Sequence, residues 1–176
     1  MQASGFLFFP LGLAATGLVA SILGIFIVKL RSAKEPASAL RSGTLLAPAI
    51  FIVMAYFLMN SMGDIPMAVL WCVISGAAGG VLIGLITEYY TGSTPVKKIA
   101  ESGETGSATV MISGLSVGMQ SVVIPILILA TIILVSTSLA NGAGVVGVYG
   151  VGIAAVGMLS TVGITMAIDA YGPVAD

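Results

Sequence analysis

Apolar residues fill most of the chain in long runs, and short polar segments separate these runs. The runs cover about residues 6–28, 39–58, 66–89, 109–139 and 148–170. A helix needs about 20 consecutive apolar residues to cross the hydrocarbon core of a bilayer, and each run reaches that length. The pattern therefore predicts an all-α polytopic helix bundle with five transmembrane helices, forming a single membrane region over residues 1–176.

The polar segments predict how this bundle is oriented in the membrane. All six Lys and Arg residues lie in or directly beside two segments, about 29–38 and 90–108, which follow the first and third apolar runs. The turns after the second and fourth runs contain no basic residue. Because basic loops favour the cytoplasm, we expect both segments and the C-terminus to be cytoplasmic and the N-terminus to be extracytoplasmic.

The composition supports a membrane protein and excludes several kinds of site. The chain is 58% hydrophobic and 7% charged, whereas soluble domains carry about 25% charged residues. It contains no His, which excludes a histidine metal site or general base, and it has no basic patch of the kind that binds nucleic acid. The single cysteine, Cys72, lies in an apolar run and is predicted to be a small buried residue.

Small and polar residues within the runs predict close helix packing. Gly76, Gly80 and Gly84 recur every four residues, and a second pair in the fourth run has the same spacing (Gly114 and Gly118). Glycines at this spacing let helix backbones approach closely, although a transport path lined by glycine is an alternative. Polar side chains in the fourth run, including Ser121 and Thr131, predict hydrogen bonds between helices.

Three of the seven acidic residues are candidates for chemistry. Asp169 and Asp176 are seven residues apart, which places them on one face of the fifth helix near its cytoplasmic end. Acids at a membrane span suggest function, and this pair needs a cation such as Mg²⁺ or Ca²⁺, or a basic side chain from elsewhere. Solvated acids beyond the membrane edge are the alternative. Glu88, which precedes the interfacial pair Tyr89 and Tyr90, is a further candidate at the cytoplasmic face.

Three sequence segments resemble a known family. They are EYYTGSTPVKKIA at 88–100, SGLSVGMQS at 113–121 and AIDAYGPVAD at 167–176, and they resemble the membrane-integral pyrophosphatases. The resemblance implies a homodimeric membrane pump that couples hydrolysis of Mg²⁺-pyrophosphate to movement of H⁺ or Na⁺ out of the cytoplasm. It also implies Mg²⁺ as cofactor and leaves open K⁺ as an activator of the full pump.

The same resemblance assigns roles to the two aspartates. Asp176 resembles a Mg²⁺ ligand of the family's signature helix, and Asp169 resembles the acid two turns deeper. The family's other acidic and lysine motifs are absent from these 176 residues. We therefore expect a central fragment of the pump that needs the remaining helices as partners and does not hydrolyse pyrophosphate alone. A small non-enzymatic transporter or channel subunit is the alternative.

Overall fold

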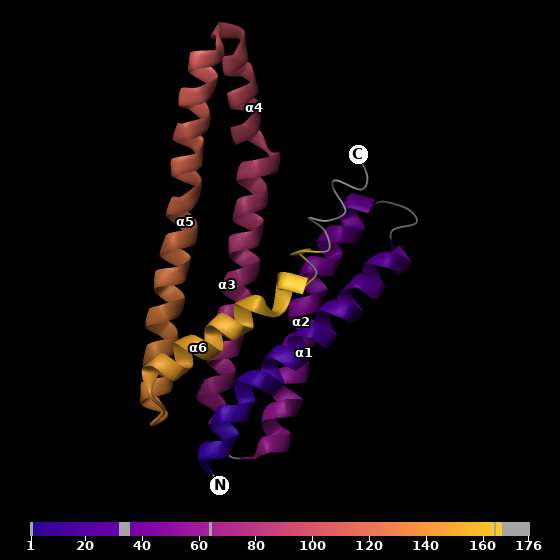
Figure 1. The fold of residues 1–176 in the computed structure, drawn as a ribbon, viewed down its shortest axis with the longest axis vertical. Coiled ribbons are helices and arrows are strands. Elements are labelled where there is room, and N and C mark those ends of the chain that lie inside the picture. The colour runs from indigo at the N-terminus through magenta and orange to yellow at the C-terminus, as the bar shows by residue number, and fades with distance from the viewer. Residues whose placement is uncertain (1, 32–35, 64, 164, 167–176) are drawn as a thin grey trace. The chain divides into compact units, whose positions relative to one another are not determined.

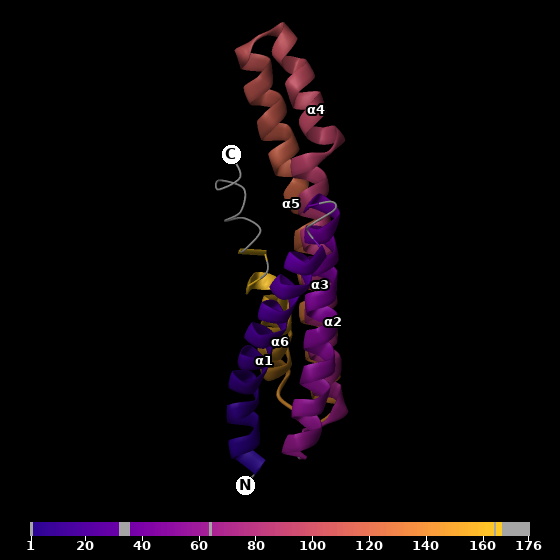
Figure 2. The same cartoon turned by 90° about the vertical axis from the view of Figure 1, so that its right-hand side faces the viewer.

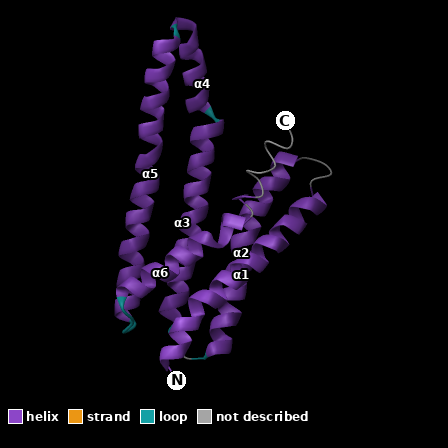
Figure 3. Cartoon of the chain, in the orientation of Figure 1, coloured by secondary structure: helices purple, strands orange, loops and turns teal. Residues whose placement is uncertain are grey.

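The computed structural model describes residues 2–31, 36–63, 65–163 and 165–166, and these residues are almost entirely helical, with no strand among them (Figure 3). The all-α prediction is therefore confirmed. The chain divides into two compact units. Unit 1 comprises Met1–Val81 and Ile132–Asp176, and unit 2 comprises Leu82–Thr131.

Two helices, α3 and α5, belong partly to each unit. Unit 1 contains α1 (Gln2–Arg31), α2 (Pro36–Met62), the first part of α3 (Met67–Gly92), the last part of α5 (Ser107–Gly142), α6 (Gly147–Met158) and the 3₁₀ turn η2 (Leu159–Thr161) (Figure 1). Unit 2 contains the rest of α3 and α5 together with α4 (Thr94–Glu101) and the 3₁₀ turn η1 (Ser102–Thr105).

Four of the helices, α1, α2, α3 and α5, contain stretches long and apolar enough to cross a membrane. The fifth predicted span, 148–170, begins with α6, a shorter apolar helix of 12 residues. It continues through η2 into helical residues 162–163 and 165–166, and its remainder lies outside the described residues. These findings support a polytopic membrane bundle.

The helices extend further than the apolar runs predict. α1 continues to Arg31 and α2 begins at Pro36, so both helices enter the segment predicted as a loop over 29–38. The segment predicted as a loop over 90–108 contains α4 and η1. The difference has a physical cause, since helical hydrogen bonding continues in polar sequence outside the apolar run, and proline fits the first turn of a helix.

The helices of unit 1 alternate in direction. α1 and α2 are antiparallel, because Gly12 lies against Leu58 and Gly17 lies against Phe51. α1 and α6 are parallel, since the start of α6 contacts the start of α1 and Ser160, just after α6, contacts the later residue Ser21 (Figures 1 and 2). This alternation is what short connections between membrane spans require.

Glycines bring the backbones of α3, α5 and α6 together in unit 1. A Cβ atom at Gly76 would overlap the carbonyl group of Ala154, and one at Gly157 would lie 2.5 Å from the Val73 carbonyl oxygen. At Gly150 it would lie 2.7 Å from the carbonyl oxygen of Ser136. Glycine is therefore required where these helices cross, because any side chain would push the backbones apart.

The close packing predicted for the spaced glycines differs between the two units. The packing prediction is confirmed for Gly76 and for Gly80, where a Cβ atom would lie 3.2 Å from the Met158 carbonyl oxygen. It is not met at three positions in unit 2, where a Cβ atom would have no neighbour within 4 Å in the described part of the chain: Gly84, Gly114 and Gly118. The spacing of these three glycines allows close packing, but no described atom is close enough to use it.

Unit 2 is a helical hairpin with a structured turn. α3 leads through α4 and η1 to Gly106, whose φ of +133° favours glycine, and α5 then begins. The Thr109 hydroxyl donates hydrogen bonds to the carbonyls of Ser102, at 2.9 Å, and Gly106, at 2.6 Å. None of residues 82–131 is buried, so the hairpin has no core of its own.

Candidate functional site

The predicted site residues fall in different parts of the chain. Asp169 and Asp176 lie outside the described residues. Glu88 lies near the end of α3 in unit 2 and is exposed, beside Tyr89 and Tyr90, whose rings make an edge-to-face contact at 5.5 Å. In the part of the chain that the structure describes, no three Asp, Glu, His or Cys side chains come together to hold a metal. The described residues therefore do not form a Mg²⁺ site by themselves.

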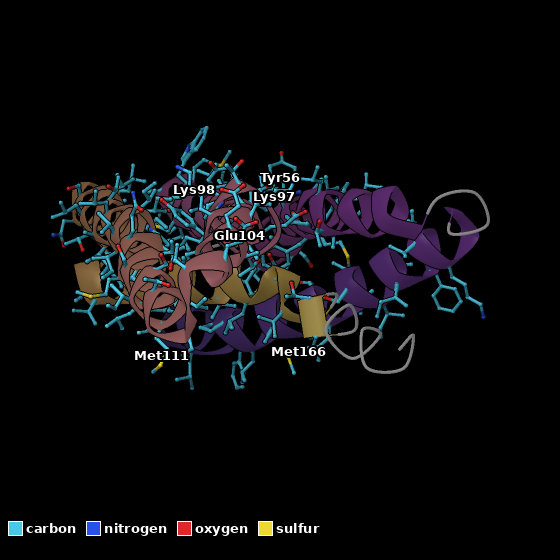
Figure 4. The ribbon with its side chains drawn as sticks, turned by 90° about the horizontal axis from the view of Figure 1, so that it is seen from above. Tyr56, Lys97, Lys98, Glu104, Met111 and Met166 are labelled. Carbon is cyan, nitrogen blue, oxygen red and sulfur yellow. The ribbon has the colours of Figure 1, made fainter. Side chains whose placement is uncertain are left out.

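The polar end of unit 2 carries the described charges that follow Glu88. These are Lys97, Lys98 and Glu101 on α4 and Glu104 on η1, and Figure 4 labels Lys97, Lys98 and Glu104. α4 begins after Ser93, with Pro95 in its first turn, where the missing backbone N–H costs no helical hydrogen bond. All four charged side chains are exposed. This end of the hairpin can therefore exchange contacts with water, ions or lipid headgroups.

Polar groups inside unit 1 connect α3 to α5. The Cys72 thiol donates to the Ser136 carbonyl oxygen at 3.6 Å, and the Ser75 and Ser136 hydroxyls lie 3.2 Å apart. The Ser75 hydroxyl also donates to the Cys72 carbonyl, at 2.9 Å. Cys72 is fully buried, which confirms the prediction for this residue, and its thiol has a hydrogen-bond partner in addition.

The hydroxyl groups that connect α3 to α5 differ from two of those predicted from the sequence. Ser121 and Thr131 donate to carbonyls of their own helix, at Gly118 and Leu127, so the interhelical prediction is wrong for both. Ser136, which does connect two helices, is fully buried in α5. A serine or threonine that meets no other helix satisfies its hydroxyl within its own turn, and the sequence pattern does not reveal which ones do so.

A second polar contact connects α1 to η2. The Ser21 hydroxyl donates to the Ser160 carbonyl oxygen at 3.2 Å, and both side chains are buried. In the part of the chain that the structure describes, the hydroxyl of Ser160 itself has no hydrogen-bond partner. At the other end of α6 the Tyr149 hydroxyl donates to the Phe6 carbonyl, at 2.9 Å, so α1 holds α6 at two points. These contacts fix helix positions and contain no carboxylate or basic side chain.

Comparison with known proteins gives a consistent assignment. A family model described as inorganic H+ pyrophosphatase matches residues 1–176. A protein of Clostridium tetani assigned as a K(+)-stimulated pyrophosphate-energized sodium pump is 47% identical over 173 residues, which are 96% of this chain and 25% of that protein. A protein of Bacteroides thetaiotaomicron with the same assignment is 44% identical over 179 residues, 95% of this chain and 24% of that protein.

A proton pump is also among the relatives. The K(+)-insensitive pyrophosphate-energized proton pump of Methanosarcina mazei is 39% identical over 173 residues, 96% of this chain and 26% of that protein. The chain thus spans about a quarter of the length of these curated relatives. Together with the long apolar helices, the relatives identify an integral membrane protein. Because the family model covers every residue, this chain belongs to the inorganic H+ pyrophosphatase family.

Proposed function

We propose that this chain is the central part of a membrane pump that couples pyrophosphate hydrolysis to movement of H⁺ or Na⁺ out of the cytoplasm. The observation that carries the proposal is the family match over residues 1–176, combined with relatives named as pyrophosphate-energized pumps. The remaining helices of the pump are the partners that this proposal requires, and the complete pump is proposed to act as a homodimer.

The coupling ion can be proposed from the relatives. The two at 47% and 44% identity are assigned as K(+)-stimulated sodium pumps, whereas the proton pump of Methanosarcina mazei is 39% identical. We therefore propose Na⁺ as the transported ion and K⁺ as an activator. Hydrolysis that is equally fast without K⁺, together with proton uptake into vesicles, would instead assign the pump to the K(+)-insensitive proton pumps.

The orientation in the membrane is proposed from the distribution of charge. The basic segments that follow α1 and α3 are placed in the cytoplasm together with the C-terminus, and the N-terminus is placed outside. The parallel course of α1 and α6 supports this arrangement, because the basic end of α1, with Lys29 and Arg31, then lies on the same side as the end of α6. The residues that follow α6 lead to Asp169.

Asp176 is proposed as a Mg²⁺ ligand, with Asp169 supporting the same site and Glu88 as a lesser candidate at the cytoplasmic face. When bound, Mg²⁺ would neutralise phosphate charge and polarise the phosphoryl group. The described residues supply no set of ligands, so the other ligands would come from parts of the pump beyond these 176 residues. The chain alone is expected to bind pyrophosphate weakly and not to hydrolyse it.

The proposal is tested by reconstitution. Mg²⁺-dependent pyrophosphate hydrolysis is measured in membranes that hold this chain alone, the flanking parts of the pump alone, and both together. We expect activity only in the combined sample. If the parts assemble, as shown by co-purification, and the combined sample is inactive, the chain is instead a non-enzymatic transporter or channel subunit.

Asp176→Ala in the complete pump tests the proposed ligand. We expect hydrolysis to fall by roughly a hundredfold or more, since a direct metal contact contributes several kcal/mol. Glu104→Ala is the matched control, because Glu104 is an exposed carboxylate on η1, and it should retain activity. Normal hydrolysis in Asp176→Ala would remove this residue from the site.

A further inference from the structure

The end of α6 contains a local change in helix geometry at a buried position. α6 ends at Met158, the 3₁₀ turn η2 follows over Leu159–Thr161, and residues 162–163 are α-helical again. A 3₁₀ stretch within a helix often marks a place under strain or with a functional role. The backbone N–H of Val162 bonds to the Leu159 carbonyl in the tighter pattern. The position of helical residues 162–163 depends on what holds η2.

The hydroxyl of Ser21 on α1 provides such a contact. It donates to the Ser160 carbonyl oxygen at 3.2 Å, and Ser21 is only 4% exposed. A hydrogen bond to a backbone carbonyl fixes the path of the main chain, independently of the side chain on the residue that is held. Inside a membrane bundle, water does not compete for that carbonyl, so the hydroxyl determines where the turn lies.

Glycine at position 163 makes the contact close. A Cβ atom at Gly163 would lie 2.6 Å from Ser21 Cβ and 2.7 Å from Ser21 Oγ, so the Ser21 side chain rests directly on the backbone there. One turn earlier on α1, a Cβ atom at Gly17 would lie 3.8 Å from Ser160 Cα. Gly17 and Ser21 thus form one contact face against Ser160 and Gly163.

The side chain of Ser160 makes it possible to test the backbone contact separately from side-chain chemistry. Ser160 is 1% exposed, and its Oγ has no hydrogen-bond partner among the described residues. The hydrogen bond from α1 goes to the backbone carbonyl of this residue, and the Gly17 contact is with its Cα. If the contact acts through the main chain, the side chain of Ser160 can be removed without harm, whereas the side chain of Ser21 cannot.

We propose that Ser21 is a positioning residue, whose contacts with the Ser160 carbonyl and with Gly163 hold the end of α6 and η2 against α1. Gly163 precedes Asp169 by six residues in the sequence. The functional part of this proposal rests on the function proposed above, in which Asp169 and Asp176 belong to the pyrophosphate site. Loosening the contact should therefore weaken the binding of Mg²⁺-pyrophosphate by the complete pump.

The contact itself is tested by disulfide formation in the complete pump, with Cys72 and any other cysteine replaced by Ser. The Cβ atoms of a disulfide are about 3.8 Å apart, so Ser21→Cys with Gly163→Cys requires only a small separation of the helices. Mild oxidation should join the two introduced cysteines in a disulfide and so abolish their labelling by maleimide. Reductant should restore the labelling. Ile22→Cys with Gly163→Cys is the control, because Ile22 is 53% exposed. Equal labelling of both pairs after oxidation would overturn the contact.

The functional role is tested by kinetics of Ser21→Ala, Ser160→Ala and Ser75→Ala in the same pump. Ser21→Ala should raise KM for Mg²⁺-pyrophosphate by about threefold to tenfold, the range of one interhelical hydrogen bond, while kcat changes less than about twofold. Ser75→Ala removes a comparable hydroxyl contact between α3 and α5 and should leave KM unchanged, as should Ser160→Ala.

Two results would overturn the positioning role. One is an unchanged KM in Ser21→Ala, and the other is an equal rise in Ser21→Ala and Ser75→Ala, which would indicate a general loss of structure. If the unmodified pump does not hydrolyse pyrophosphate, the proposed function fails and the positioning role fails with it. The disulfide experiment still decides whether the contact exists.

Discussion

The two units of the chain use the same kinds of residue in opposite ways. In unit 1, glycines lie against the backbones of neighbouring helices, and large side chains such as Phe9, Phe51 and Ile153 are fully buried. In unit 2, which also contains glycine and long apolar stretches, no residue is buried. A glycine motif therefore gives a helix the ability to pack closely, but a partner helix must be present for that ability to stabilise anything.

This difference in packing between the two units agrees with a chain that spans about a quarter of the length of its relatives. Unit 1 brings parts of five helices together and forms a core from this sequence alone. Unit 2 has the two long helices of a hairpin, and two helices cannot enclose a core. Substitutions should accordingly be costly in unit 1 and nearly neutral in unit 2, and three matched pairs in the 176-residue chain test that contrast.

The largest difference is expected between two isoleucines. Ile153 in α6 is 1% exposed, whereas Ile112 in α5 is 70% exposed. Ile153→Ala should lower the free energy of unfolding by about 2–5 kcal/mol, because it leaves a cavity among packed helices. Ile112→Ala should change it by less than about 0.5 kcal/mol. SDS titration in detergent micelles, followed by circular dichroism, measures both, and similar losses would show that unit 2 is packed as tightly as unit 1.

A glycine pair on one helix should show the next largest difference. Gly76→Ala places a methyl group on the Ala154 carbonyl and should destabilise unit 1 by about 1–3 kcal/mol. Gly84→Ala, two turns later in α3, meets nothing within 4 Å and should stabilise the helix by up to about 1 kcal/mol. SDS titration followed by circular dichroism measures the free energy of unfolding of both variants. Destabilisation by Gly84→Ala would mean that this face has a partner in the isolated chain.

The smallest difference is expected between two serines of α5. Ser136→Ala removes the side-chain contact with Ser75 and should cost about 0.6 kcal/mol and at most about 1.7 kcal/mol. Ser121→Ala removes only a bond to the carbonyl of Gly118 within the same helix, so it should be close to neutral. A double-mutant cycle of Ser75→Ala with Ser136→Ala measures the pair directly, and strict additivity would show that these hydroxyls do not interact.

Only part of the candidate site could be predicted from the sequence. The motifs around Glu88 and Asp169 indicated the family, and the family match confirms it. The importance of Ser21 and Ser160 could not be predicted, because each is an ordinary serine in an apolar run and the two are 139 residues apart in the chain. Such a contact depends on which faces of α1 and α6 meet, and no local pattern contains that information.

The sequence by itself determined that this protein is helical, lies in the membrane and belongs to a known family, because run length, charge placement and motifs are properties of the chain alone. Only the tertiary structure decided that Gly76 packs against a neighbouring helix and Gly84 does not, and that Ser136 bonds across helices while Ser121 bonds within its own. The physical reason is that helical periodicity fixes which residues share a face, whereas the neighbour of that face is set by the packing of the whole bundle.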